Sequence, residues 1–265
     1  MSENEAVGKV IAIANQKGGS GKTTTTRSLA AAMVEMGRRV LMVDMDPQGS
    51  LTEGCGVRPY ELDKSIYHVL LGRCRLADVL LEVEPELHLA PTNIHLAAAE
   101  LQLVPATRRE DKLRQALGPL RDYYDYTLID CPPSFGLLTV NSLSAADSVL
   151  IPMTCDYYTM LGVRLLLETV GDIQREVNPS LTVEGLLPTR YDGRTLHARE
   201  ILDQTRQALG KQMRVFEEVV KESVRFKEAP IKAQSIMTYA ANSDGANAYR
   251  EVAREIDNGK ARAGS

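Results

Sequence analysis

The stretch Lys17-Gly18-Gly19-Ser20-Gly21-Lys22-Thr23-Thr24 decides the fold of this chain. It follows an apolar run of strand length, residues 10–14, and it precedes a segment of helical pattern. Glycines let the backbone turn tightly and expose its N–H groups to an anion, and the start of a helix adds positive dipole. The pattern therefore predicts a phosphate-binding loop (P-loop) in which Lys22 contacts the β- and γ-phosphates and Thr23 offers its hydroxyl to Mg²⁺.

This loop departs from the common G-x-x-x-x-G-K-[ST] pattern at one position. The pattern places glycine at position 16, where the chain has Gln16, and a second lysine, Lys17, precedes the glycine pair. A glycine-rich turn with two solvated lysines is the alternative interpretation. The setting between a buried strand and a helix favours a variant P-loop, with nucleotide contacts from residues 17–24.

Apolar runs of strand length alternate with helical segments along the whole chain. The runs cover residues 10–14, 39–43, 87–90, 126–129, 148–152 and 183–187. Between the last two, apolar residues from Met160 to Val177 recur at helical spacing, and Asn178-Pro179 ends that helix. Several runs are apolar throughout, as strands covered on both faces should be. The alternation predicts an α/β fold with a doubly wound, mainly parallel β-sheet and helices on both faces.

The length and composition fit a single α/β domain. The chain has 265 residues, no fixed-period repeat and no Gly/Ser linker. We expect a flexible amino-terminal tail at residues 1–8, one P-loop domain at 9–257 and a flexible carboxyl-terminal tail at 258–265. The net charge of −4 argues against a uniformly basic nucleic-acid binder, so any DNA contact must be a local patch.

The compartment is predicted from what the sequence lacks. Residues 1–8 do not have the order of a signal peptide, and no apolar run approaches the roughly 20 residues that span a bilayer. The four cysteines include no C-x-x-C pair, which favours reduced thiols. We therefore expect a cytoplasmic protein.

Acidic residues follow two further apolar runs. Asp44 and Asp46 come after residues 39–43, and Asp130 ends the run at 126–129. The carboxyl ends of parallel strands form the crevice in which open α/β sheets bind ligands. Carboxylates there can hold Mg²⁺ and orient an attacking water molecule. A turn or capping role is the alternative for each one alone. Beside a P-loop, the three together favour a magnesium site.

The motifs, taken together, resemble a known family. The runs KGGSGKTT, DMDPQGS, LIDCPPSFGLLTVNSL, TRYDGRT and FKEAP occur in that order. They resemble the ParA/Soj-type chromosome and plasmid partition ATPases of the deviant Walker A group, which also contains MinD. The resemblance spans residues 9–256. It implies an ATPase that uses ATP and Mg²⁺, produces ADP and phosphate, and forms an ATP-sandwich homodimer.

The resemblance also implies roles for single residues. Lys17 would cross the dimer and touch the partner's nucleotide, and together with Lys22 and Asp46 it would form the catalytic set. Asp46 would position the hydrolytic water. Thr23 would bind the magnesium directly, and Asp130, like Asp46, would lie at its water shell.

Adenine contacts are implied near the end of a late strand. The matching positions are Thr189 and residues 220–222. The family often has Pro-Arg-Asn in the second stretch, whereas this chain has Lys221-Glu222-Ser223. The base contacts therefore depart from the family's pattern.

Nonspecific binding to double-stranded DNA is implied for the ATP dimer. The matching basic positions are Arg194 and Arg225, with Lys221, Lys227 and Lys232 close in sequence. Such residues contact phosphates and give salt-dependent, sequence-independent affinity. Four glutamates are interspersed, so a solvated face of mixed charge is the alternative.

The implied cycle ends with stimulated hydrolysis. A ParB/Spo0J-type centromere-binding protein would stimulate hydrolysis, release the DNA and so drive segregation of a chromosome or plasmid by a nucleoid-associated ATPase. A DNA-anchored ATPase that positions a protein organelle or a receptor cluster would carry the same motifs. A MinD-like membrane role is disfavoured, because the expected last helix, 246–256, is followed by residues with almost no apolar face. A redox role would need cysteines that hold a shared cluster, and Cys131 fits a small buried residue better.

Overall fold

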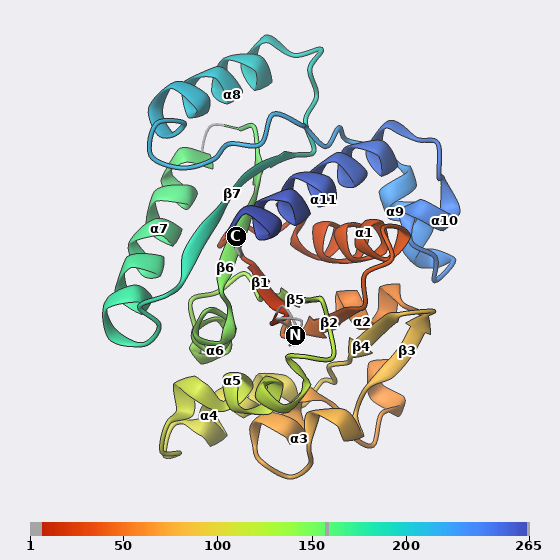
Figure 1. Ribbon diagram of the computed structural model, residues 1–265, viewed down its shortest axis with the longest axis vertical. Coiled ribbons are helices and arrows are strands. Elements are labelled where there is room, and N and C mark those ends of the chain that lie inside the picture. The colour runs from red at the N-terminus through yellow and green to blue at the C-terminus, as the bar shows by residue number, and fades with distance from the viewer. Residues whose placement is uncertain (1–6, 157–158, 264–265) are drawn as a thin grey trace, which may run out of the picture.

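A seven-stranded sheet crosses the computed structural model, which describes residues 7–156 and 159–263 (Figure 1). The strand order is β3-β4-β2-β5-β1-β6-β7, and every pairing is parallel except that of β3 with β4. The strands are β1 (Lys9–Ile13), β2 (Val40–Asp44), β3 (Leu81–Glu84), β4 (Leu87–Ala90), β5 (Tyr126–Asp130), β6 (Ser148–Thr154) and β7 (Thr182–Thr189).

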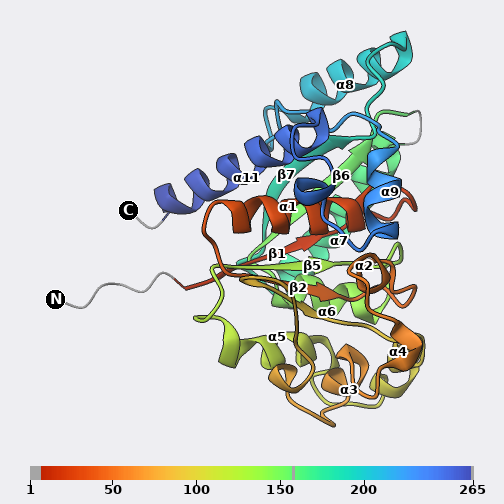
Figure 2. The ribbon, with the colours of Figure 1, turned by 90° about the vertical axis from the view of Figure 1, so that its right-hand side faces the viewer.

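Helices cover both faces of this sheet (Figure 2). The helices α1, α10 and α11 pack on one face, and α3 to α8 pack on the other. The bounds are α1 (Lys22–Glu35), α2 (Ser50–Gly54), α3 (Ile66–Leu70), α4 (Leu96–Leu103), α5 (Lys112–Leu117), α6 (Leu137–Ala145), α7 (Thr159–Glu176), α8 (Leu196–Leu209), α9 (Arg225–Ile231), α10 (Ile236–Tyr239) and α11 (Asp244–Ala263).

The core has two layers because successive strand residues point to opposite faces. In β1, Ile11 and Ile13 pack into the layer of α1 and α11, whereas Val10 and Ala12 pack into the layer of α6 and α7. All four are buried. This confirms the predicted doubly wound, mainly parallel sheet. The antiparallel edge strand β3 was not among the predicted runs, since its sequence LEVE is only partly buried.

The last helix is longer than the sequence indicated. We expected a helix over 246–256 and a flexible tail from residue 258, but α11 continues to Ala263. Its apolar face lies on α1, with Tyr249, Val252 and Ile256 fully buried. Once packing has formed a helix, each further residue adds a backbone hydrogen bond at little cost. Residues 1–6 and 264–265 of the expected tails lie outside the described residues.

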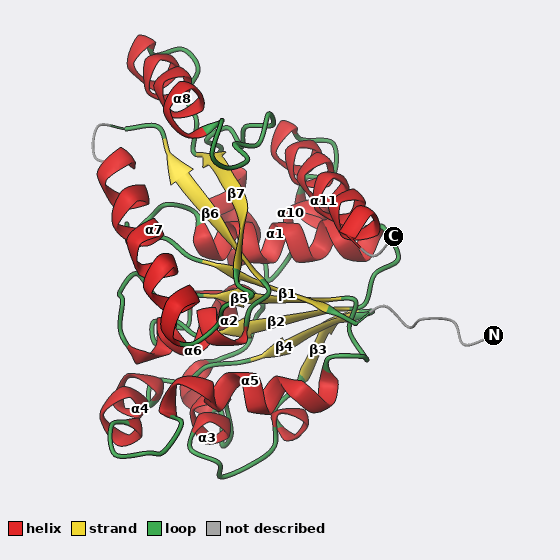
Figure 3. Cartoon of the chain, turned by 60° about the vertical axis from the view of Figure 1, so that its left-hand side comes forward, coloured by secondary structure: helices red, strands yellow, loops and turns green. Residues whose placement is uncertain are grey.

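The parallel strands all end on the same side of the sheet, so their carboxyl ends lie next to one another (Figure 3). The register aligns Ile13 of β1 and Asp44 of β2 with Asp130 of β5. The loops that follow these strands therefore begin side by side. The loops after β6 and β7 start at the same edge, since both strands are parallel to β1. Such an edge is where open α/β sheets bind ligands.

One backbone irregularity lies in β7. The register between β6 and β7 shifts so that Gly185, with φ of 152°, faces Leu150. A Cβ at position 185 would lie 2.8 Å from Cε2 of the buried Phe216 and 3.1 Å from the carbonyl oxygen of Arg214. Glycine is therefore required here by both conformation and space.

We predict that Gly185→Ala lowers the free energy of unfolding by about 2–4 kcal/mol, because the new methyl group meets a packed ring in a strained backbone. Urea denaturation followed by circular dichroism measures the change. Gly162→Ala is the matched control: nothing lies within 4 Å of its Cβ position inside α7, so the variant should gain up to about 1 kcal/mol. Equal stability of the two variants would contradict the steric argument.

Candidate functional site

The loop between β1 and α1 forms an open cradle. Gly19 and Gly21 have φ angles of 72° and 89°. Gly21 is also the N-cap of α1, where no side chain caps the first turn. A Cβ at Gly18 would meet nothing within 4 Å among the described residues. Backbone N–H groups at a helix start without a cap are suited to binding phosphate oxygens.

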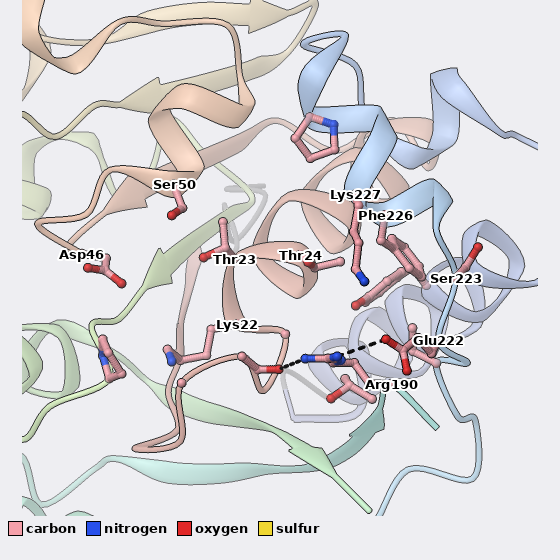
Figure 4. A pocket seen from close by; sticks show the side chains of 18 of the residues that line it. Lys22, Thr23, Thr24, Asp46, Ser50, Arg190, Glu222, Ser223, Phe226 and Lys227 are labelled. Atoms are coloured by element: carbon pink, nitrogen blue, oxygen red, sulfur yellow. Dashed lines mark hydrogen bonds and ion pairs between the residues drawn. The ribbon is translucent and has the colours of Figure 1, made fainter. Parts of the chain in front are cut away.

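This cradle opens into a pocket of about 470 Å³ (Figure 4). The volume lies in the range of small-molecule sites. Its walls come from the P-loop, the loop after β2, the end of β7 and helix α9. The residues that line it include Gly18, Gly19, Gly21, Lys22, Thr23, Thr24, Asp46, Gln48, Ser50, Pro133, Thr189, Arg190, Val220, Lys221, Glu222, Ser223, Phe226, Lys227, Pro230 and Tyr249.

Lys22 brings a buried positive charge to the pocket. Its side chain is 7% exposed, and Nζ reaches the carbonyl oxygen of Lys17 at 3.4 Å. Burial lowers the pKa of Lys22, although the nearby Asp130 acts in the opposite direction. Because burial disfavours the ammonium ion, an anion bound beside it would stabilise the charged form. This is the electrostatic environment that a phosphate needs.

Two carboxyl groups are buried below the loop. Asp130 accepts a hydrogen bond from the hydroxyl of Thr23 at 2.7 Å, and Asp44 accepts from the amide and hydroxyl of Thr52 at 2.9 and 2.6 Å. Burial raises the pKa of Asp44 to about 7. It raises the pKa of Asp130 well above its usual range, and repulsion by Asp44 adds to this. Asp44 thus anchors α2, while Asp130 lies directly under Thr23.

Oxygen atoms are available for a divalent cation at this place. Thr23 and Asp46 line the pocket, and Asp130 holds the Thr23 hydroxyl from behind. Asp46 is half-buried and accepts a hydrogen bond from the amide of Gln48 at 3.0 Å. Figure 4 shows Asp46 and Thr23 on the same side of the pocket as Lys22. Hydroxyl and carboxylate oxygens are the ligands Mg²⁺ prefers, so these residues fit the predicted metal.

Three residues of the predicted nucleotide set lie at the margin of the pocket or behind it. Thr189 lines the pocket, but its hydroxyl donates to the carbonyl oxygen of Ser20 at 2.7 Å and so supports the loop. The Ser20 hydroxyl is buried without a partner among the described residues. Lys17 points elsewhere: its Nζ donates to Thr154 at 3.2 Å and forms an ion pair with Asp156. In this conformation Lys17 lies at the end of β6, outside the pocket lining.

Arg190 is a site residue that the sequence analysis missed. Its backbone is left-handed, with φ of 50°, which is uncommon outside glycine and is often found at functional sites. Nη1 donates to the carbonyl oxygen of Gly19 at 3.0 Å, and Nη2 pairs with Glu222 at 3.0 Å (Figure 4). Arg190 thereby joins the P-loop to the segment in which Lys221-Glu222-Ser223 departs from the family's pattern. Its only sequence signal was its position in the quoted run TRYDGRT.

Helix α9 and the first turns of α11 complete the pocket with aromatic side chains. Phe226 and Tyr249 line it and contact each other edge to face, with ring centroids 5.9 Å apart. Figure 4 shows Phe226 and Lys227 facing Thr24. The sequence analysis did not single out Phe226 and Tyr249, because an aromatic residue in a helix is as typical of the buried core as of a ligand site.

The five predicted DNA contacts are all exposed. Arg194 pairs with Asp192 at 2.8 Å, and Lys221 pairs with Asp244 at 3.0 Å. Arg194, Lys221 and Lys227 line one shallow pocket of about 570 Å³. Arg225 begins α9 and Lys232 follows its end. The structure thus brings Arg194, Lys221 and Lys227 together around one pocket. It places Arg225 and Lys232 at the two ends of α9, the helix that also carries Lys227.

Comparison with known proteins gives consistent matches. An AAA domain family matches residues 8–183. The sporulation initiation inhibitor protein Soj of Bacillus subtilis is 41% identical over 94% of this chain and 98% of Soj. The chromosome partitioning protein ParA of Myxococcus xanthus is 43% identical over 94% of this chain and 88% of its own length.

A solved structure is similar over almost the whole chain. The crystal structure of cobyrinic acid a,c-diamide synthase from Mycobacterium smegmatis, with a bound ATP analog and magnesium, has a TM-score of 0.83 and 40% identity. It covers 94% of this chain and 93% of that one.

Lys22→Met should weaken ADP binding by roughly 10- to 100-fold, because the variant loses a charge-assisted contact to phosphate. Isothermal titration calorimetry measures the affinity. The melting temperature should not fall, since the variant removes a buried charge that forms no ion pair in the described residues. The matched control, Lys211→Met, changes an exposed lysine and should bind ADP as the natural chain does. Unchanged affinity in Lys22→Met would refute the phosphate site.

Proposed function

The chain belongs to the ParA/Soj family of P-loop ATPases, and we propose that it is a DNA-partition ATPase. In this proposal, ATP binding drives sandwich dimerisation and nonspecific DNA binding, and hydrolysis releases the DNA. The observation that carries the proposal is the position of the exposed basic patch, defined here as Arg194, Lys221, Arg225, Lys227 and Lys232. This patch shares walls with the nucleotide pocket.

The site residues fit ATP and Mg²⁺. The P-loop N–H groups and Lys22 would hold the phosphates, while Thr23, Asp46 and Asp130 would hold the cation. When bound, Mg²⁺ neutralises charge on the phosphates. Asp46 is half-buried at the pocket wall, where a carboxylate can orient a water molecule for attack. Its position supports the catalytic role that the family resemblance implies.

In this proposal, binding of the nucleotide is coupled to binding of DNA through a wall that two pockets share. Lys221, Glu222, Ser223 and Lys227 line both the nucleotide pocket and the shallow pocket beside Arg194. Arg190 connects this shared segment to the P-loop through Glu222. A nucleotide that moves the P-loop or the shared segment therefore changes the arrangement of the basic patch. This is how ATP binding would control DNA affinity.

Lys17 supports the dimer in the proposal. Its side chain is 37% exposed and its ammonium group is paired with Asp156 within the chain. An exposed surface ion pair of this kind contributes little stability, about 0–1 kcal/mol, so it can be exchanged for another contact. The nucleotide of a second copy would offer phosphate oxygens instead. The contact between Lys17 and that nucleotide would then form only when two ATP-bound copies associate.

The cargo in the proposal is DNA. Two of the curated relatives are named as chromosome partitioning protein ParA and as Soj. We propose that a ParB/Spo0J-type centromere-binding protein stimulates hydrolysis, and that the ATP-bound dimer associates with the nucleoid. Across the residues that the structure describes, no helix is long and apolar enough to cross a membrane.

The solved structure from Mycobacterium smegmatis supports a second candidate function. That protein is named as a synthase of cobyrinic acid a,c-diamide, and its 40% identity extends over 94% of this chain. Such an activity would form a diamide of an acid, and its name calls for no DNA and hence for no basic patch. Dependence of function on Arg225 therefore separates the two candidates.

Lys17→Ala should abolish ATP-dependent dimerisation and reduce stimulated hydrolysis at least tenfold, while the chain stays folded and monomeric with ADP. Size-exclusion chromatography with multi-angle light scattering, run with ATP and Mg²⁺, measures the dimer. Asp46→Ala is the companion variant, because it should lose hydrolysis yet keep the dimer. Normal dimerisation of Lys17→Ala would contradict the proposed role.

Arg225→Glu should weaken binding to a 60-base-pair DNA of arbitrary sequence by at least tenfold in low salt, because it places repulsive charges against phosphates. Fluorescence anisotropy in ATP and Mg²⁺ measures the affinity. The exposed Arg75, which pairs with Asp78 and lines neither the nucleotide pocket nor the shallow pocket beside Arg194, supplies the control Arg75→Glu. ATP affinity should not change in either variant. Loss of DNA binding in both would show a net-charge effect and not a patch.

A further inference from the structure

A small chamber lies beside the nucleotide pocket. It has a volume of about 40 Å³ and shares Thr23, Thr24, Ser50, Phe226 and Pro230 with that pocket. Figure 4 shows Ser50, Thr23 and Thr24, three of these shared residues, around the nucleotide pocket. The remaining lining residues come from α1, α2, α9 and the start of α10. They are Arg27, Ser28, Leu51, Gly54, Ala229, Gln234 and Ile236.

Arg27 is the charged residue of this lining. It is 8% exposed, and its Nη1 is buried without a hydrogen-bond partner in the part of the chain that the structure describes. No carboxylate lies among the described residues that line the chamber. The guanidinium lies against the end of α2, where a Cβ on Gly54 would be 3.3 Å from Nη1. Glycine at this position leaves the guanidinium its space.

A buried arginine without a partner is costly. Arginine stays charged at every physiological pH, and an isolated charge is unfavourable in a low-dielectric interior. Folded proteins therefore almost always pair such a group with an anion. Among the described residues, no carboxylate lies within ion-pair distance of Arg27, and only Nη1 of its guanidinium is recorded as buried without a partner. A bound anion would supply the partner.

The surroundings of Arg27 define the chemistry of that ligand. Thr24, Ser28 and Ser50 bring hydroxyl groups to the lining, and Gln234 brings an amide. A guanidinium presents its N–H groups as a fork that matches the oxygens of phosphate. The chamber has room for a small anion or a few water molecules.

We propose that this chamber binds a small inorganic oxyanion of the phosphate class through Arg27, at a site beside the glycine-rich part of the P-loop and distinct from it. The bound anion would connect α1, α2 and α9, which lie on different sides of the nucleotide pocket. It would therefore stabilise the folded chain whether or not the partition function holds. The source can be free phosphate or the phosphate released by hydrolysis, because the chemistry is the same.

Thermal unfolding of the full chain in saturating ADP and Mg²⁺ tests the site, because the nucleotide then occupies the P-loop. Circular dichroism is the suitable probe, since the chain has no tryptophan. Inorganic phosphate at 10 mM, added at constant ionic strength with chloride as the replaced salt, should raise the Tm by roughly 2–5 °C. A second arm adds ATP in place of ADP under turnover, with and without a phosphate-scavenging enzyme. A Tm that falls when phosphate is scavenged shows that phosphate released by hydrolysis fills the site, and an unchanged Tm shows that only the added phosphate of the first arm does.

Arg27→Leu should lose the phosphate response and, in phosphate-free buffer, melt at or above the temperature of the natural chain, because it no longer buries an unpaired charge. Arg27→Met is a second neutral variant, to be used if the leucine variant does not fold. Arg164→Leu is the control: it removes an exposed arginine that lines neither the nucleotide pocket nor the chamber, and it should respond to phosphate normally.

Two results would overturn the proposal. The first is a natural chain whose Tm does not respond to phosphate relative to chloride. The second is a neutral Arg27 variant that responds as strongly as the natural chain does. Failure of the ADP site itself is detected separately, by the calorimetry of Lys22→Met, so it cannot be mistaken for failure of this site.

Discussion

The hydrogen bond from Thr23 to Asp130 joins the first turn of α1 to the end of β5, and the site is built around it. It depends on a constraint of the fold. Parallel strands end at one edge, so β1, β2 and β5 deliver their loops to one place. The same bond fixes the hydroxyl that faces the pocket, and it gives the buried Asp130 a donor.

A basic group and two acidic groups are buried together at the carboxyl ends of the strands, and a bound ligand would balance their charges. Lys22 is buried and its pKa is lowered by that burial, whereas the pKa values of Asp44 and Asp130 are raised. Burial thus shifts the pKa of each group toward its neutral form. A phosphate beside the lysine and a divalent cation beside the carboxyl groups would favour the charged forms together. Further along α1, Nη1 of Arg27 is buried without a hydrogen-bond partner among the described residues, and an anion would balance the charge of this side chain as well.

Local pattern predicted most of the fold and the centre of the site. Apolar periodicity predicted the central strands, and the P-loop spacing predicted how Lys22 and Thr23 are placed. It did not single out β3, because this strand is only four residues long and only partly buried. Nor could it predict the pairing of Lys17 with Asp156, because the two residues are 139 positions apart and meet only through β6. Arg190 was missed for a related reason: its importance lies in a left-handed backbone that the sequence does not display.

The wall shared by the two pockets has a thermodynamic consequence. Four residues line both the nucleotide pocket and the shallow pocket beside Arg194. They are Lys221, Glu222, Ser223 and Lys227. If one ligand changes the affinity for the other, linkage requires the reverse effect to have the same size. A chain held on DNA would then bind its nucleotide more tightly by the same factor by which the nucleotide strengthens DNA binding. Four side chains would in this way make each ligand sense the presence of the other.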